Sequence, residues 1–298
     1  QNITVIKFPK TGEISIGIFM LIRNDKSYEN TRIMMKIATW NVRGWAILPW
    51  YENKKISDET VDKIMKEKAD IFVITEIALA SGWDYLEKQM QENEYVWFLS
   101  FVSGSNGVLI LAKKEIIKNV KELAENLWWK NKNLHSYNDI GLMKVTFKMS
   151  DGKNCTVCGF RMLIGNKKGK AQYDDMRKIL YQKVLPIAEE CYLENDVVIF
   201  AGDFNNARYL KDYSGKDQID YNWQIIKSKF ENIGYKMLDV DDKGNPINTK
   251  LTTPASPIDH IFTKGFIKDT CGVSQQTGCS DHLILRAEGK IVNSSEGC

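Results

Sequence analysis

The sequence of 298 residues is short of features that would place it in a narrow class. It has no run of the roughly 18–20 apolar residues that a membrane-spanning helix needs, which argues against a membrane span. The apolar stretch 14–22 is too short for one, and it lacks the small-residue cleavage pattern of a signal peptide. It also has no large charge of either sign, and a net charge of +3 neither indicates nor excludes a nucleic-acid partner.

The chain has no second CxxC pair to complete a zinc site. Cys155 and Cys158 have that spacing, but they lie in a strand pattern, where residues three apart point to opposite faces. We therefore expect neither a structural zinc ion nor a disulfide there, and we interpret the cysteines as buried free thiols. This interpretation predicts a reducing compartment, the cytoplasm; secretion stays open because the chain begins with Gln1.

What is present is ordinary for a globular protein, with 43% hydrophobic and 27% charged residues. A chain of this length can bury a full core without disulfides or metals. We expect one domain over residues 35–290, preceded by an extension over 1–34 whose place in the native protein is open, and followed by a tail over 291–298. We expect a monomer with no obligate protein partner.

Strand and helix patterns alternate along the domain. The strand patterns cover residues 36–42, 69–75, 95–102, 107–112, 142–149, 155–164, 197–203, 258–263 and 283–288. The helix patterns cover residues 59–68, 82–92, 170–194 and 223–233, and Pro186 predicts a bend in the third. Some strands are linked by hairpin turns and others through helices, which predicts an α/β (α+β) protein with mixed sheets and helices outside them.

The most informative stretch is an apolar strand pattern that ends in Gly-Asp-Phe-Asn at residues 202–205. On an extended backbone, residues i and i+2 project to the same side, so we expect Asp203 and Asn205 to address one point in space. A carboxylate that accepts a proton, beside an amide that donates hydrogen bonds, suits a water and a phosphoryl oxygen held side by side.

Four more polar signals lie at the ends of strand patterns, where a rigid sheet commonly presents reactive groups. Each of them alone is also the ordinary sign of a turn or a helix cap. Five independent turns would have no reason to follow the order in which these residues occur. The signals in chain order are Asn41, Glu76, the Asp203–Asn205 pair, Asp259 and the pair Asp281 and His282.

This ordered set resembles the endonuclease/exonuclease/phosphatase superfamily, which has the DNase I-like fold. The matching motifs are TWNVRG at 39–44, ITE at 74–76, GDFN at 202–205, IDHIF at 258–262 and SDH at 280–282. The resemblance implies a four-layer α-β-β-α sandwich of two mixed β-sheets. It also implies hydrolysis of a phosphoester bond with a divalent metal, normally Mg²⁺, with Mn²⁺ as an alternative.

The chemistry of phosphoester hydrolysis accounts for these residue types. A hard cation neutralises the phosphate charge and takes oxygen ligands, for which Glu76 is the first candidate, helped by Asn41 and Asp281. Asp203 is expected to orient the attacking water or accept its proton. Asn205 is expected to hold that water or a phosphoryl oxygen without adding negative charge.

His282 is expected to face the phosphate as an imidazolium, with Asp259 as the carboxylate that the family places beside it. One departure from the family pattern concerns the strand before the long helix, where many members carry a histidine. Arg161 stands there in this chain. Arginine is no general acid at ordinary pH but grips phosphate through two hydrogen bonds. The leaving group is then stabilised by fixed charge, or its proton comes from elsewhere; the alternative is an arginine that merely extends from a strand edge to solvent.

Substrate contacts leave weaker traces in the sequence. Lys167 and Lys168 are candidates to contact phosphates, although such a lysine loop is more often only solvated. Trp45 is a candidate to stack on bases, with loop packing as the equal alternative. Arg43 matches a position where DNase-like members have an arginine near the phosphate backbone.

The function that these residues favour is metal-dependent hydrolysis of phosphodiester bonds in nucleic acid, by a DNA endonuclease or exonuclease. The alternative is a phosphatase or phosphodiesterase for a small or lipid-linked phosphate, such as an inositol phosphate or sphingomyelin. Residues 253–258 (TPASPI) differ from the Trp-Cys-Asp-Arg type of inositol phosphatases, and secreted sphingomyelinases carry a signal peptide. A third alternative is a binding module without activity. Loss of Glu76, Asp203 or His282 would have favoured it, but all three are present.

Overall fold

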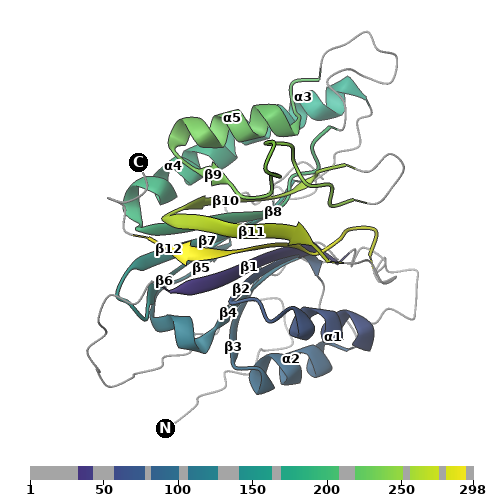
Figure 1. The fold of residues 1–298 in the computed structure, drawn as a ribbon. Coiled ribbons are helices and arrows are strands. Elements are labelled where there is room, and N and C mark those ends of the chain that lie inside the picture. Colours follow the sequence, from purple (N-terminus) through teal and green to yellow (C-terminus); the bar gives the residue numbers. More distant parts are fainter. Residues whose placement is uncertain are drawn as a thin grey trace.

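Two six-stranded β-sheets pack face to face, and helices cover both outer faces (Figure 1). The computed structural model describes residues 33–42, 57–77, 82–100, 107–126, 141–162, 169–207, 219–250, 256–274 and 280–292, with only the backbone for 119–126. The predicted extension and tail lie, except at their inner ends, outside the described residues. Among the described helices, none is long and apolar enough to cross a membrane.

The first sheet has the strand order β11-β12-β1-β2-β4-β3. β1 and β2 are parallel, and the other neighbours are antiparallel, so the sheet is mixed as expected. Its strands are β1 (Met34–Asn41), β2 (Ile71–Ile77), β3 (Tyr95–Ser100), β4 (Gly107–Lys113), β11 (Phe266–Val273) and β12 (Leu285–Ile291).

The second sheet has the strand order β5-β6-β7-β8-β10-β9, with β7 and β8 parallel. β6 and β7 form the predicted hairpin, whose turn contains Gly152 at φ 91°. The strands of this sheet are β5 (Ile117–Asn126), β6 (Gly141–Met149), β7 (Asn154–Arg161), β8 (Val197–Asp203), β9 (Lys236–Met237) and β10 (Asp259–Lys264).

Two of the helices, α1 and α5, begin at residues whose side chains cap them. Ser57 accepts a hydrogen bond from the backbone of Thr60 at the start of α1, and Asn222 caps α5 in the same way. Near Pro186, which has no N–H to donate, the long helix passes through a π-helical turn. The helices are α1 (Asp58–Glu67), η2 (Lys114–Ile116), α2 (Trp83–Glu92), α3 (Lys170–Ile179), the π-helical η4 (Leu180–Val184), α4 (Leu185–Glu194) and α5 (Trp223–Ile233).

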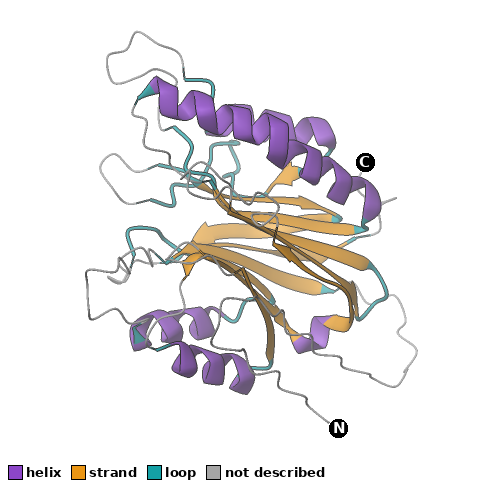
Figure 2. Cartoon of the chain, turned by 180° about the vertical axis from the view of Figure 1, so that it is seen from behind, coloured by secondary structure: helices purple, strands orange, loops and turns teal. Residues whose placement is uncertain are grey.

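Three apolar cores separate four layers. One lies between the sheets, one between α1, α2 and the first sheet, and one between the α3–α5 helices and the second sheet. The same layers are visible from the opposite side (Figure 2). This confirms the four-layer sandwich. Cys155 packs in the core between the sheets and Cys158 in the helix-side core, so the two point to opposite faces as predicted, and both are free thiols.

Candidate active site

Several predicted site residues converge where strands of both sheets end. Asp203 is the last residue of β8, and its register partners on the neighbouring strands are Arg161 of β7 and Asp259 of β10. Asn41, the last residue of β1, reaches across from the first sheet, and its Nδ2 donates to Asp203 Oδ2 at 2.8 Å. His282 is joined to the same end of β1, because its carbonyl accepts from the Trp40 indole at 3.0 Å.

Glu76 reaches this point through an irregularity in β2. Alternation along the strand would place Glu76 with Phe72 and Ile74, which face α1 and α2. A register shift between Thr75 and Ile77 and a left-handed backbone at Glu76 (φ 57°) interrupt the alternation. The side chain therefore turns to the space between the sheets, where it meets Arg161.

Asp203 and Asn205 come together, but the predicted reason is wrong. β8 ends at Asp203, and Asn205 has a left-handed backbone (φ 47°), so the two residues do not share an extended strand. The turn brings the backbone N–H of Asn205 to 2.8 Å from Asp203 Oδ1, and its side-chain Nδ2 to 2.9 Å from Asp203 Oδ2. The second amide hydrogen of Asn205 goes to the carbonyl of Met162. Asn205 thus orients the carboxylate of Asp203.

The pKa of Asp203 is raised in spite of the hydrogen bonds that the carboxylate accepts. It is 1% exposed, and burial raises its pKa from 3.8 to about 6, with the negative charge of Asp259 adding to the rise. The cations His282 and Arg161 oppose this effect. A carboxylate with a pKa near 6 is ionised at neutral pH and remains a useful proton acceptor.

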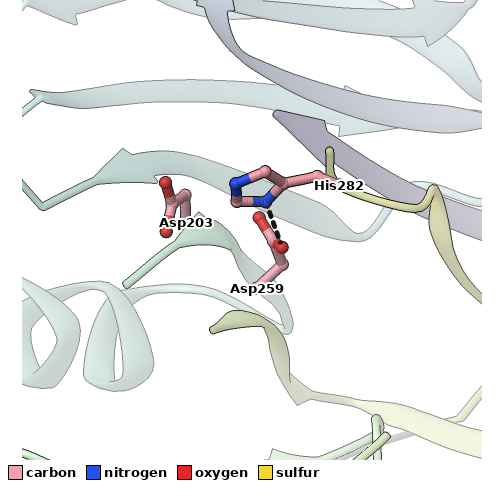
Figure 3. Close-up of side chains that lie close together, drawn as sticks. All are labelled: Asp203, Asp259 and His282. Carbon is pink, nitrogen blue, oxygen red and sulfur yellow. Dashed lines mark hydrogen bonds and ion pairs between the residues drawn. The ribbon is translucent and has the colours of Figure 1, made fainter. Parts of the chain in front are cut away.

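His282 and Asp259 form a buried pair, with His282 Nδ1 at 2.7 Å from Asp259 Oδ2. Figure 3 shows the imidazole between the carboxyl groups of Asp259 and Asp203. Burial alone would lower the pKa of His282, but the charge and hydrogen bond of Asp259, together with Asp203, raise it from 6.5 to about 9. One ligand atom from each of the three residues lies within 4.8 Å of the others, a spacing that also suits a metal ion. With Nδ1 held by Asp259, the ring in this arrangement is protonated at neutral pH and has Nε2 left as a donor.

Glu76 offers a separate place for a cation. Arg161 donates from Nε and Nη2 to a single oxygen, Glu76 Oε1, at 3.0 and 2.6 Å. The other oxygen, Oε2, is buried and accepts no hydrogen bond from the part of the chain that the structure describes. A buried carboxylate oxygen of this kind is costly unless a partner satisfies it, and a hard divalent cation would do so. The Oε2 oxygen of Glu76 therefore fits a metal of this class as a ligand.

The remaining predicted residues are only partly placed by the structure. Asp281 lies 3.5 Å from Lys250 Nζ in an ion pair, and the metal role predicted for Asp281 stays a prediction. The predicted substrate contacts Arg43, Trp45, Lys167 and Lys168 lie outside the described residues. Lys250 was missed from sequence because it lies in no motif; the bridge Lys250↔His282 brings it to the site.

A second buried histidine was also missed as a site feature, although its motif was recognised. His260 is 0% exposed and lies between Asp239 and Asn206, on the side of β10 opposite Asp259. One signal in the sequence could have indicated this network, the Asn-Asn pair at 205–206. If Asn206 is buried beside the site, its amide needs a polar partner of its own.

Comparison with known proteins identifies the family of the chain. A model of the Endonuclease/Exonuclease/phosphatase family matches residues 38–282. The chain belongs to this family. Membership of the endonuclease/exonuclease/phosphatase family makes the protein a hydrolase of phosphoester bonds. A search of the curated proteins found no match.

Solved structures of similar proteins share the fold at low identity. An endonuclease/exonuclease/phosphatase from Beutenbergia cavernae DSM 12333 has a TM-score of 0.62 and 15% identity, covering 88% of this chain and 72% of that one. ANGEL2, a 2',3'-cyclic phosphatase in complex with adenosine-2',3'-vanadate, has a TM-score of 0.60 and 13% identity, covering 91% and 99%. D. rerio TDP2 complexed with a single-strand DNA product has a TM-score of 0.60 and 18% identity, covering 86% and 98%. At such identities the likeness establishes the fold.

Proposed function

We propose that this protein hydrolyses phosphodiester bonds in nucleic acid with the help of a divalent cation, Mg²⁺ or alternatively Mn²⁺. The observation that carries the proposal is the group of Asp203, Asp259 and His282 at the end of the second sheet, with an imidazolium between two carboxyl groups. Such a group offers a proton acceptor and a fixed positive charge to one small volume, as attack by water on a phosphate requires.

The cation would be held by Glu76, through Oε2, and by Asn41. A cation at Asn41 would bind Oδ1, because Nδ2 donates to Asp203. When bound, a divalent cation neutralises phosphate charge and polarises the phosphorus–oxygen bonds. Asp281 is a further proposed ligand from the sequence motif, and its ion pair with Lys250 would have to rearrange for it to serve.

Side chains of the protein then accept the proton, bind the phosphate and stabilise the leaving group. Asp203, ionised above pH 6 and oriented by Asn41 and Asn205, accepts a proton as the water oxygen forms its bond to phosphorus. His282, held through Nδ1 by Asp259, donates a hydrogen bond from Nε2 to a phosphoryl oxygen. The bond from phosphorus to the ester oxygen breaks, and Arg161 stabilises the departing oxyanion by its charge until solvent protonates it.

Nucleic acid is the proposed substrate class on two grounds. Two proteins of similar fold were solved with nucleic-acid or nucleoside ligands, single-strand DNA for TDP2 and adenosine-2',3'-vanadate for ANGEL2. Lys250 adds a cation beside His282, where a polyanion would approach the site.

The buried free thiols Cys155, Cys158 and Cys191 suit a reducing compartment, and we propose the cytoplasm.

The first test is the Asp203→Asn variant. It keeps the size of the side chain, but it replaces one of two accepting oxygens with an amide donor and removes the proton acceptor. We therefore expect kcat to fall by about 100-fold or more. The substrates are plasmid DNA, abasic duplex, RNA and a panel of small phosphoesters, each with Mg²⁺ or chelator. The control is Asp242→Asn, which changes an exposed aspartate outside the site and should leave kcat unchanged.

Wild-type turnover that survives chelation would contradict the metal requirement. Turnover confined to small phosphoesters would replace the nucleic-acid assignment by the alternative class. A folded Asp203→Asn variant with wild-type kcat would remove the role assigned to Asp203.

A further inference from the structure

We propose that the buried chain Asp239–His260–Asn206 is a positioning device that holds the turn carrying Asp203 and Asn205 in its working shape. The inference rests on the proposed function of that turn. The contacts of the three side chains are with one another and with backbone groups, so they act through the turn and are positioning residues.

The chain of contacts is short and fully buried. His260 Nδ1 lies 2.7 Å from Asp239 Oδ2, and His260 Nε2 lies 2.9 Å from Asn206 Oδ1. The other oxygen of Asp239 accepts from the backbone N–H of Ile261 at 2.9 Å. Asn206 Nδ2 donates to the carbonyl of Pro257 at 3.0 Å. The three side chains are 0–3% exposed, so the network is built into the core.

Alternation along β10 explains why this network lies behind the active site. Asp259 and Ile261 face the core between the sheets, and His260 and Phe262 face the helices. Consecutive residues of β10 therefore carry two histidine–carboxylate pairs, Asp259 with His282 on the site side and His260 with Asp239 on the helix side. The second pair braces the strand from which the first one is presented.

The donors and acceptors determine where the protons lie. The amide nitrogen of Asn206 must face the carbonyl of Pro257, so its oxygen faces His260. His260 Nε2 therefore donates to Asn206 Oδ1, and Nδ1 is left to contact Asp239. The amide of Asn206 cannot flip, because its nitrogen would then face His260 Nε2 and its oxygen would face the carbonyl of Pro257.

The device holds the turn at its far end, and other contacts hold the near end. The N–H of Phe204 donates to the carbonyl of Ile258 at 2.8 Å, and the carbonyl of Phe204 accepts from Tyr221 Oη at 2.7 Å. Asn205 follows in a left-handed conformation that asparagine adopts at some cost. Fixing Asn206 through His260 keeps Asn205 in this conformation, and Asn205 in turn orients Asp203.

Two substitutions at His260 separate positioning from stability. In His260→Asn the amide nitrogen takes the place of Nδ1 and keeps the hydrogen bond to Asp239, but the hydrogen bond to Asn206 is lost. In His260→Gln the amide nitrogen takes the place of Nε2 and keeps the hydrogen bond to Asn206, but Oδ2 of the buried Asp239 carboxylate loses its partner. We expect kcat to fall roughly 10- to 100-fold in His260→Asn with KM unchanged, because displacing a catalytic group by about 1 Å has this effect.

We expect His260→Gln to show the opposite pattern. It should keep most of the wild-type kcat while unfolding at a lower urea concentration than His260→Asn, because an unpaired buried carboxylate is strongly destabilising. If the loss of kcat follows the loss of stability across the two variants, or if His260→Asn keeps the wild-type kcat, the positioning role is wrong.

A third variant keeps the test decisive if His260→Gln does not fold. Asn206→Ala breaks the same link from the other side, so the double variant with His260→Asn should lose no more kcat than either single variant. Losses that multiply in the double variant would contradict a shared link.

A measurement without substrate separates this inference from the proposed function. In the wild-type protein the backbone N–H of Asn205 donates to Asp203 and should exchange slowly with solvent in NMR experiments. Exchange should accelerate in His260→Asn and Asn206→Ala and stay slow in His260→Gln. This pattern would support the device even if no phosphodiester proved to be a substrate, and unchanged exchange in all variants would overturn it.

Discussion

At the scale of single residues, the candidate site holds a charged imidazole, His282, at a buried position. Burial alone would favour its neutral form. His282 is 4% exposed, and only the adjacent carboxylates keep it charged. Lys250 acts in the opposite direction by lowering the pKa of His282. The balance among Asp259, Asp203 and Lys250 therefore decides whether His282 is charged at neutral pH.

We predict that His282 titrates near pH 9 in the metal-free protein, as measured by NMR of the ring. In Asp259→Asn the pKa should fall to its ordinary value of 6.5 or below, because burial is then no longer offset. A raised histidine pKa stabilises the fold fully below about pH 6.5, and this contribution disappears as pH rises through 9. The wild-type advantage in unfolding free energy over Asp259→Asn should shrink across that window. A His282 pKa near 6.5 in the wild type would contradict this electrostatic picture.

At the scale of elements, backbone irregularities at strand ends aim the functional side chains. The bulge in β2 redirects Glu76, and the turn after β8 directs Asn205. Gly202 makes the last step of β8 possible, because φ is +143° and a Cβ there would lie 1.8 Å from the carbonyl oxygen of Phe160 on β7. The glycine of the Gly-Asp-Phe-Asn motif is thus required by the neighbouring strand.

We predict that Gly202→Ala costs more than about 4 kcal/mol of unfolding free energy or prevents folding, because the clash is with backbone. Gly244→Ala is the matched control: it also has a positive φ (+80°), but a Cβ there would have no neighbour within 4 Å. Its cost should be about 1 kcal/mol, from backbone strain alone. Urea unfolding measures both, and equal costs would show that the approach of β7 is unimportant.

Most elements could be predicted from sequence, and the exceptions share a cause. β5, β9 and β11 lacked the alternation that marks a strand. β5 is rich in Lys and Glu, lies at the edge of its sheet and has three register shifts. β9 has only two residues, and β11 is an exposed edge strand with a shift near Asp269. Edge strands bury only part of their surface, so their sequences carry a weaker pattern.

At the scale of the whole molecule, the site exists only where the two sheets meet. The first sheet supplies Asn41 and Glu76, and the second supplies Arg161, Asp203 and Asp259. The hydrogen bond from Asn41 to Asp203 and the ion pair of Arg161 with Glu76 both cross from one sheet to the other. A cation held between the sheets would therefore stabilise the sandwich as well as the reaction.

We predict that Mg²⁺ raises the unfolding free energy by about 1.4 kcal/mol when its concentration is ten times its Kd, and that a chelator reverses the gain. Glu76→Gln should abolish the response, because it removes the charge of the proposed ligand. Glu92→Gln, at an exposed position on α2, should keep it. Thermal unfolding with and without Mg²⁺ measures these effects, and a full response in Glu76→Gln would place the cation elsewhere.

The alternation of apolar residues was sufficient to predict mixed sheets with helices outside them, because it is a local pattern. The four layers and the proposed roles of Asp203, Asp259 and His282 came from the family resemblance that the ordered motifs carry. Only the tertiary structure decided how Glu76 and Asn205 are aimed, since a bulge and a left-handed turn depend on neighbouring strands. It also decided the partners Arg161–Glu76 and His260–Asn206, which lie 85 and 54 positions apart along the chain. Such contacts between distant segments are established by the packing of the strands, and a single sequence carries no local trace of them.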